Sequence, residues 1–167
     1  MDTAEEKVIS EESVAGGIFR EILYLLLKIV AIATAIVVIF TFIFGVFRYA
    51  DNAMLPAVKD GDLVFYYRLR NSYVASDLVV LNYQGKEQVR RVIATAGDVV
   101  DIKEDGTVIV NGKTLNEPYV DGKALGECDI ELPYQVPDER IFVMGDHRST
   151  SVDSRTKRIG CIAEEAV

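Results

Sequence analysis

The residues best suited to chemistry lie close together between residues 144 and 155. This segment contains Ser151 and, four residues before it, His147, the only histidine of the chain. A serine hydroxyl and an imidazole within hydrogen-bonding reach of each other can act as nucleophile and general base in acyl transfer. The other interpretation is that His147 lies on a structural turn, because catalysis requires a geometry that spacing alone does not establish.

A long apolar segment precedes everything that could do chemistry. Residues 29–47 contain no charged side chain, and the apolar run reaches back to residue 22 with only Lys28 interrupting it. At 1.5 Å per residue, these residues would extend about 28 Å as a helix, which is close to the hydrocarbon thickness of a bilayer. We therefore expect a transmembrane helix over residues 22–47, behind an acidic mobile tail over residues 1–21. A cleaved signal peptide has a shorter apolar core and no acidic tail before it.

The orientation of this helix does not follow from charge. Arg20 and Lys28 lie on its N-terminal side and Arg48 follows it directly, so that lysine and arginine counts barely favour either direction.

After residue 47 the pattern changes to short segments rich in aromatic and β-branched residues, which is typical of strands. Glu104-Asp105-Gly106 and Asn111-Gly112 are turn signals between such segments. We find no amphipathic helix in this region and expect an irregular stretch over residues 121–138. The predicted strands are residues 63–67, 77–81, 88–93, 99–103, 107–110, 113–115 and 141–144. The sequence thus predicts a mainly β domain over residues 48–167.

Composition excludes several kinds of site. Residues 48–167 contain twenty acidic and fifteen basic residues, and no basic stripe favours nucleic acid as a partner. Cys128 and Cys161 have neither the spacing nor the companions of a metal site, so we predict no metal and no cofactor. They are either two buried free thiols or, outside the cell, a disulfide.

Four separated segments gain meaning when they are considered together. They are Ala53-Met54-Leu55-Pro56 with Asp60-Gly61-Asp62, Val89–Ile93 with Gly97-Asp98, Asn111-Gly112-Lys113 with Asn116–Tyr119, and Met144–Arg148 with residues 151–155. In order and spacing, they resemble the bacterial type I signal peptidases (family S26). The resemblance covers essentially all of residues 22–167. It implies a signal-peptidase/LexA-like antiparallel β domain behind one N-terminal transmembrane helix.

The resemblance also implies a reaction and the residues that carry it. Type I signal peptidases cut signal peptides from exported proteins at the outer face of the membrane. A serine attacks the scissile carbonyl, and a lysine kept neutral by burial removes its proton. Ser151 corresponds to a serine that hydrogen-bonds this lysine, and Asp153 with Arg155 to a supporting ion pair.

At three catalytic positions the chain departs from the family pattern. Ala53 stands at the nucleophile position and has no oxygen. Arg90 stands at the base position, and a guanidinium binds its proton too strongly to be a usable base. Asp51 stands at a position that helps to form the oxyanion hole, where a carboxylate repels developing negative charge. We therefore expect an inactive site; an engineered serine-to-alanine exchange would account for Ala53 alone.

The cleft permits two further hypotheses. Asp51 and Arg90 correspond to groups that line the same cleft, so they either form a structural ion pair or remain two solvated side chains at its edge. Met54, Val58 and Val89 match positions that line the peptide pockets of the family, although each is equally explained as core.

Three functions remain open at this stage. The leading hypothesis is a non-catalytic, single-pass plasma-membrane protein with an extracytoplasmic domain. It resembles the signal-peptidase-like accessory proteins of Gram-positive pilus gene clusters, which implies an exported peptide or pilin and a sortase as partners. The alternatives are an active signal peptidase that uses non-standard residues, and a binding or scaffold module with no link to secretion.

Overall fold

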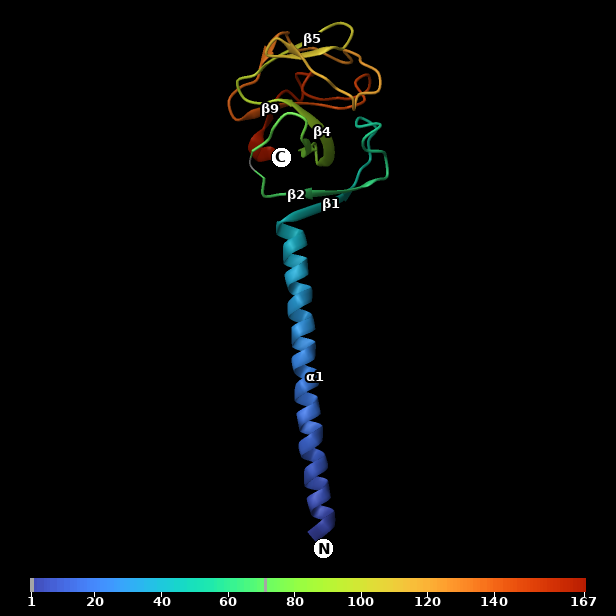
Figure 1. Ribbon diagram of the computed structural model, residues 1–167, viewed down its shortest axis with the longest axis vertical. Coiled ribbons are helices and arrows are strands. Elements are labelled where there is room, and N and C mark those ends of the chain that lie inside the picture. The colour runs from blue at the N-terminus through green and yellow to red at the C-terminus, as the bar shows by residue number, and fades with distance from the viewer. Residues whose placement is uncertain (1, 71) are drawn as a thin grey trace. The chain divides into compact units, whose positions relative to one another are not determined.

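The computed structural model describes residues 2–70 and 72–167, and the side chains of residues 17–70 and 72–167. The chain divides into two compact units, residues 1–44 and residues 45–167. Figure 1 shows one continuous helix in the first unit and strands in the second.

The first unit consists of helix α1, Asp2–Phe42. Within it, Gly17–Phe42 is long and apolar enough to cross a membrane by length and composition. The side chains of residues 18–42 are exposed on all sides of the helix, which suits a lipid environment better than water. Thr34 and Thr41 donate their hydroxyls to the carbonyl oxygens of the residues four positions earlier, at 2.8 and 2.7 Å, so these polar groups are satisfied within the helix.

Both predicted ends of the transmembrane helix differ from the structure. The helix begins at Asp2 and not at residue 22, because the preceding stretch is rich in helix-favouring residues and has acidic residues at its N-terminal end. It ends at Phe42, and residues predicted as helix form strand β1, Phe44–Arg48. A Cβ on Gly45 would lie 2.2 Å from the ring of Tyr66, so this glycine allows the close approach of β2. The mobility of the tail stays a prediction.

The second unit contains three sheets. β1 pairs with β2 in a two-stranded sheet, and the two four-stranded sheets have the orders β10-β9-β4-β3 and β7-β6-β5-β8, with every pairing in them antiparallel. The strands after β1 are β2 Leu63–Tyr67, β3 Leu78–Tyr83, β4 Lys86–Ala94, β5 Val99–Ile102, β6 Val108–Val110, β7 Lys113–Thr114, β8 Tyr134–Gln135, β9 Arg140–Met144 and β10 Ile162–Ala163. A 3-10 turn, Glu164–Ala166, follows.

The mainly β prediction is confirmed. The seven predicted strands correspond to β2, β3, β4, β5, β6, β7 and β9. β1, β8 and β10 were not predicted, because β8 and β10 have two residues each and the first four residues of β1 continue the charge-free apolar run.

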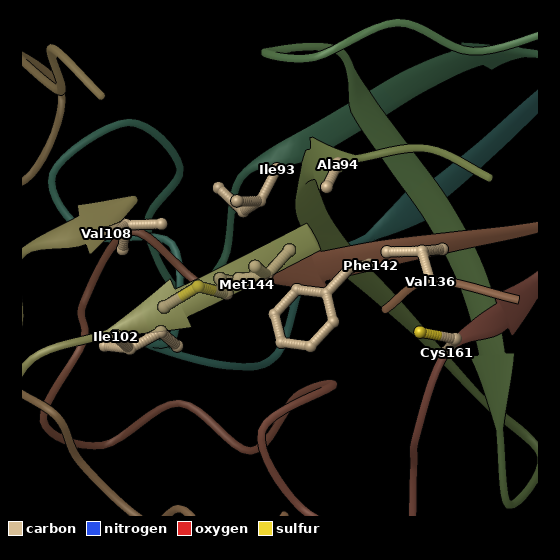
Figure 2. Close-up of a cluster of buried hydrophobic side chains, with 9 residues drawn as sticks. Ile93, Ala94, Ile102, Val108, Val136, Phe142, Met144 and Cys161 are labelled. Atoms are coloured by element: carbon tan, nitrogen blue, oxygen red, sulfur yellow. The ribbon is translucent and has the colours of Figure 1, made fainter. Parts of the chain in front are cut away.

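β4 and β9 form the centre of the domain and are buried on both faces. Alternate residues of these strands enter two core clusters, as the period of two along a strand requires. Ile93 and Phe142 belong to the cluster shown in Figure 2, which joins β4 and β9 to β5 and β6. Val92 and Val143 belong to a second cluster with β3. These two strands are therefore a rigid base for any site beside them.

Both cysteines are free thiols in the structure. Cys161 is part of the core cluster in Figure 2, and Cys128 is half-buried. The interpretation as two free thiols is the one that this structure matches.

Candidate functional site

Antiparallel pairing of β4 with β9 brings together two of the four segments on which the family resemblance rests. They are Val89–Ile93 and the C-terminal signature, which is Met144–Arg148 with residues 151–155. Arg91 is opposite Met144 and Val92 is opposite Val143. Two residues beyond Met144, the Asp146 carboxylate accepts two hydrogen bonds from Arg91. Nε donates to Oδ1 at 2.8 Å and Nη2 donates to Oδ2 at 2.6 Å. The bidentate bond to Asp146 raises the pKa of Arg91. The segment that contains Arg90 is thus fixed against the C-terminal signature.

The segment Asn116–Tyr119 contacts the same part of the domain, through Arg91 and Arg148. The ring of Tyr119 lies under the Arg91 guanidinium, whose central carbon is 4.0 Å from the ring centroid. Arg148 forms a fully buried ion pair with Glu117 and donates Nε to the carbonyl oxygen of Gly145 at 3.0 Å. The structure therefore assembles these segments around the end of β9.

The segment that contains the nucleophile position Ala53 forms a loop between β1 and β2, and hydrogen bonds join the two ends of this loop. The Tyr49 N–H donates to the Asp62 carbonyl at 2.8 Å, and the Gly61 N–H donates to the Tyr49 carbonyl at 2.8 Å. Gly61 has a φ of +90°, a conformation that favours glycine. In the middle of the loop, the Ala53 carbonyl accepts the His147 N–H at 2.9 Å. Ala53 is consequently buried and held against the C-terminal signature.

Gly145 marks the closest approach in this region. A Cβ at this position would lie 2.2 Å from Ser151 Oγ and 2.5 Å from the Ala53 carbonyl oxygen. No other residue fits there without displacing one of these groups. The structure therefore brings the Ala53 carbonyl and the Ser151 hydroxyl together beside Gly145.

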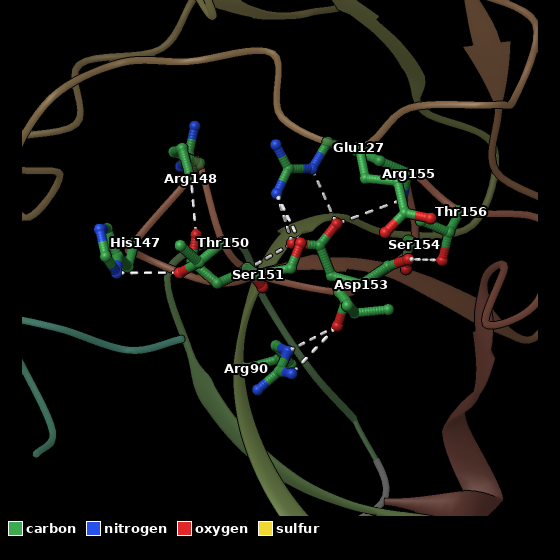
Figure 3. Close-up of polar contacts among 12 residues, drawn as sticks. Arg90, Glu127, His147, Arg148, Thr150, Ser151, Asp153, Ser154, Arg155 and Thr156 are labelled. Carbon is green, nitrogen blue, oxygen red and sulfur yellow. Dashed lines mark hydrogen bonds and ion pairs between the residues drawn. The ribbon is translucent and has the colours of Figure 1, made fainter. Parts of the chain in front are cut away.

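Arg90 is 2% exposed and is held mainly by backbone carbonyls. Its Nε and Nη2 donate to the carbonyl oxygen of Val152 at 3.1 and 3.0 Å (Figure 3). Its Nη1 donates to the Val89 carbonyl at 2.7 Å and to Oδ2 of Asp51 at 3.3 Å. Of the two alternatives for Asp51 and Arg90, an ion pair or two solvated side chains, the structure shows the ion pair. The Asp51 side chain is 37% exposed, so only the arginine is buried.

The other oxygen of Asp51 makes contacts that the sequence did not suggest. Oδ1 accepts the N–H of Asn52 at 2.7 Å and the N–H of Ala53 at 3.2 Å. By the resemblance, this position belongs to the oxyanion hole. In this structure the Ala53 N–H already donates a hydrogen bond to the Asp51 carboxylate.

Ser151 and His147 do not form a nucleophile–base pair. Ser151 is 1% exposed, and its hydroxyl has no hydrogen-bond partner among the residues that the structure describes. The His147 Nδ1 is hydrogen-bonded to Thr150 Oγ1 at 2.9 Å (Figure 3). The His147 carbonyl accepts the N–H groups of Thr150 and Ser151, at 3.2 and 3.1 Å. His147 thus lies on a structural turn, as the second interpretation held.

The predicted ion pair of Asp153 and Arg155 is confirmed and is fully buried. Arg155 donates Nε to Oδ1 and Nη2 to Oδ2 of Asp153, both at 2.8 Å (Figure 3). Oδ2 also accepts the Gly145 N–H at 3.0 Å. The pair therefore holds Gly145 in place.

The three positions predicted to line a peptide pocket lie in one apolar cluster. Met54 and Val89 are buried together with Tyr49, and Val58 packs against them. Burial, and next the nearby Asp51 charge, raise the pKa of Tyr49 to about 12. In this conformation Tyr49 occupies space beside these side chains, and they are part of the core.

Sequence reasoning missed the roles of Val152 and Gly145. Val152 acts through its backbone carbonyl, which carries no signal in residue type. Gly145 stands within a motif that was noted, but its packing role required the position of Ser151. Among the described residues, no group of three histidine, cysteine, aspartate or glutamate side chains could hold a metal ion.

Comparison with known proteins gives a consistent result. The family model described as signal peptidase, peptidase S26, matches residues 21–167. A signal peptidase I of Bacillus amyloliquefaciens is 34% identical over 139 residues, which cover 76% of this chain and 73% of the relative. A second from the same organism is 32% identical over 178 aligned residues, covering 99% of this chain and 90% of the relative. A crystal structure of a signal peptidase I from Enterococcus faecalis V583 has a TM-score of 0.46 and 23% identity, covering 57% of this chain and 92% of that chain.

Proposed function

The chain belongs to the signal peptidase family of peptidase S26, and from this premise we propose that it is a non-hydrolytic, membrane-anchored member of the family. In this proposal it binds an extended segment of an exported protein and assists surface-protein or pilus assembly. The observation that carries the proposal is the buried Arg90 at the base position, which is held by the Val152 and Val89 carbonyls and by Asp51.

The lack of hydrolysis rests on three groups. Ala53 has no hydroxyl, and the buried Ser151 hydroxyl beside it has no base in hydrogen-bonding contact among the described residues. Arg90 presents a guanidinium, which is not a usable base and therefore cannot remove a proton from a nucleophile. The Ala53 N–H is bound to Asp51 and is not free to stabilise an oxyanion. Nucleophile, base and oxyanion donor are each replaced or occupied.

Peptide binding does not depend on these three groups. Addition of an extended peptide to a sheet edge uses backbone N–H and C=O groups, and side-chain pockets add selectivity. β3 is the terminal strand of its sheet, next to β4, which carries Arg90. Such an edge supports the binding of an exported peptide or pilin.

The setting of this activity is part of the proposal. Gly17–Phe42 supports attachment to the plasma membrane as a single span, and we propose that the β domain lies on the extracytoplasmic side. The link to pilins and a sortase rests on the resemblance to accessory proteins of pilus gene clusters. A working peptidase with non-standard residues is the rival, since the relatives are named signal peptidases.

Binding and cleavage can be measured on one sample. The full-length chain in lipid nanodiscs is mixed with a fluorescent signal-peptide substrate, and anisotropy and mass spectrometry are recorded together. We expect saturable binding and an intact peptide. Absence of binding, or a cleaved peptide, would overturn the proposal. Nanodiscs that contain only the lipid are the control for partition of the peptide into the bilayer.

A further inference from the structure

One carboxylate lies where donors from two parts of the chain converge. Asp51 Oδ1 accepts the N–H groups of Asn52 and Ala53 at 2.7 and 3.2 Å, and Oδ2 accepts Nη1 of Arg90 at 3.3 Å. Two backbone donors and a guanidinium are the groups with which proteins commonly bind a carboxylate.

Two of the three donor residues, Arg90 and Ala53, have further contacts that hold them in place. The Val152 and Val89 carbonyls hold the Arg90 guanidinium. Ala53 is buried, and its carbonyl is bound to His147. The Asp51 side chain is 37% exposed, and its contact with Arg90 is the longest of the hydrogen bonds that this guanidinium makes among the described residues. The binding groups are therefore preorganised and their ligand is the exposed partner.

The charge of the site selects a carboxylate over a neutral carbonyl. Arg90 is 2% exposed, and Asp51 is its only acidic partner among the residues that the structure describes. A peptide carbonyl could replace Oδ1 at the Ala53 N–H, but it would leave the guanidinium without a counter-charge. Leaving a buried charge uncompensated is strongly unfavourable. A carboxylate satisfies both sets of donors.

A further donor lies beside this site. The Tyr49 hydroxyl is buried beside the Arg90 guanidinium and the Met54 backbone. It lies within electrostatic reach of both Asp51 and Arg90. Its pKa of about 12, raised mainly by burial, keeps it protonated and able to donate near neutral pH.

We propose that Asn52 N–H, Ala53 N–H and the Arg90 guanidinium form a carboxylate-binding site, and that Asp51 is its tethered ligand. Because Asp51 is covalently attached, its effective concentration exceeds that of any free competitor. The site is therefore closed to outside ligands in the resting protein, and a peptide in the cleft binds without the Ala53 N–H. This inference rests on the proposed function and adds to it that a bound peptide does not reach the Ala53 N–H.

Removing the tethered ligand tests the site directly. The full-length Asp51→Gly variant in uncharged detergent is titrated with acetate at neutral pH, and the melting temperature and the Asn52 and Ala53 amide shifts are recorded. We expect acetate to raise the melting temperature by about 3 °C and to shift both amides saturably. Acetamide, a neutral molecule of the same shape, and chloride at equal ionic strength should do neither. The wild type and the Asp51→Gly/Arg90→Met variant should not respond.

Each outcome decides the question. A folded Asp51→Gly variant that ignores acetate, or that responds equally to acetamide, overturns the site. Should this variant not fold, Asp51→Asn carries the test, since it keeps the shape and the Oδ1 acceptor but lacks the charge. Its melting temperature must then fall below that of the wild type, and an equal value overturns the proposal. No readout here measures hydrolysis, so failure of this site and failure of the proposed function are distinguishable.

Discussion

Arg90 donates two hydrogen bonds to the carbonyl oxygen of Val152, at 3.1 Å from Nε and 3.0 Å from Nη2. The two residues are 62 positions apart, and the contact joins β4 to the C-terminal signature. A side chain at the position of a catalytic base is thus used to hold the backbone. In this structure the charged groups Arg90 and Asp51 hold each other and the neighbouring backbone in place.

Truncating Arg90 should therefore cost stability. Arg90→Ala leaves the Val152 carbonyl without its donors, separates Asp51 from its counter-charge and opens a cavity. We expect the free energy of unfolding to fall by about 3 kcal/mol. Thermal or urea unfolding of the full-length chain measures this. Arg158→Ala is the matched control, because Arg158 is 57% exposed and its contact with Glu127 is 3.9 Å long. If the two variants melt at the same temperature as the wild type, Arg90 is not a structural lock.

Much of this arrangement was predictable, and the parts that were not share a cause. The strands follow from aromatic and β-branched residues between turn signals, and the Asp153–Arg155 pair follows from the family resemblance. The Asp51–Arg90 pair was one of two alternatives that the sequence left open. The end of α1 at Phe42 did not, because β1 is as apolar as the helix before it and only its pairing with β2 makes it a strand.

The contacts in the site that the sequence did not predict are made by backbone groups. The Val152 carbonyl that holds Arg90 and the Ala53 N–H that binds Asp51 are present in every residue type, so no residue pattern points to them. The sequence left the His147–Ser151 pair open, because the hydrogen bond between His147 Nδ1 and Thr150 Oγ1 depends on the folded turn.

The two buried hydroxyls of the C-terminal signature should respond differently to removal. Ser151 Oγ has no partner among the described residues, whereas Ser154 Oγ accepts the Val143 N–H at 2.9 Å. Ser151→Ala should leave the free energy of unfolding unchanged or raise it by up to about 1 kcal/mol, and Ser154→Ala should lower it by about 1 kcal/mol. Parallel thermal melts compare them. Equal destabilisation by both changes would show that the Ser151 hydroxyl has a partner in solution.

The two thiols should differ in reactivity. Burial raises the pKa of Cys161 to about 11, and Cys161 is 5% exposed, whereas Cys128 is half-buried. The thiolate is the reactive form, so at neutral pH iodoacetamide should modify Cys128 at least about tenfold faster than Cys161. Mass spectrometry of the native chain reports both rates, with Cys128→Ser and Cys161→Ser variants to assign them. Two thiols that resist alkylation until a reductant is added would instead indicate a disulfide.

We propose that Ala53, Arg90 and Asp51 abolish hydrolysis in a scaffold that is otherwise able to support it. The most direct measurement is cleavage of a signal-peptide substrate in lipid nanodiscs. It compares the wild type, Ser151→Ala and the triple variant Ala53→Ser/Arg90→Lys/Asp51→Gly. We predict no product from the first two and a specific product from the triple variant. A product from the wild type that disappears in Ser151→Ala would contradict the account, because Ser151 would then be a working nucleophile.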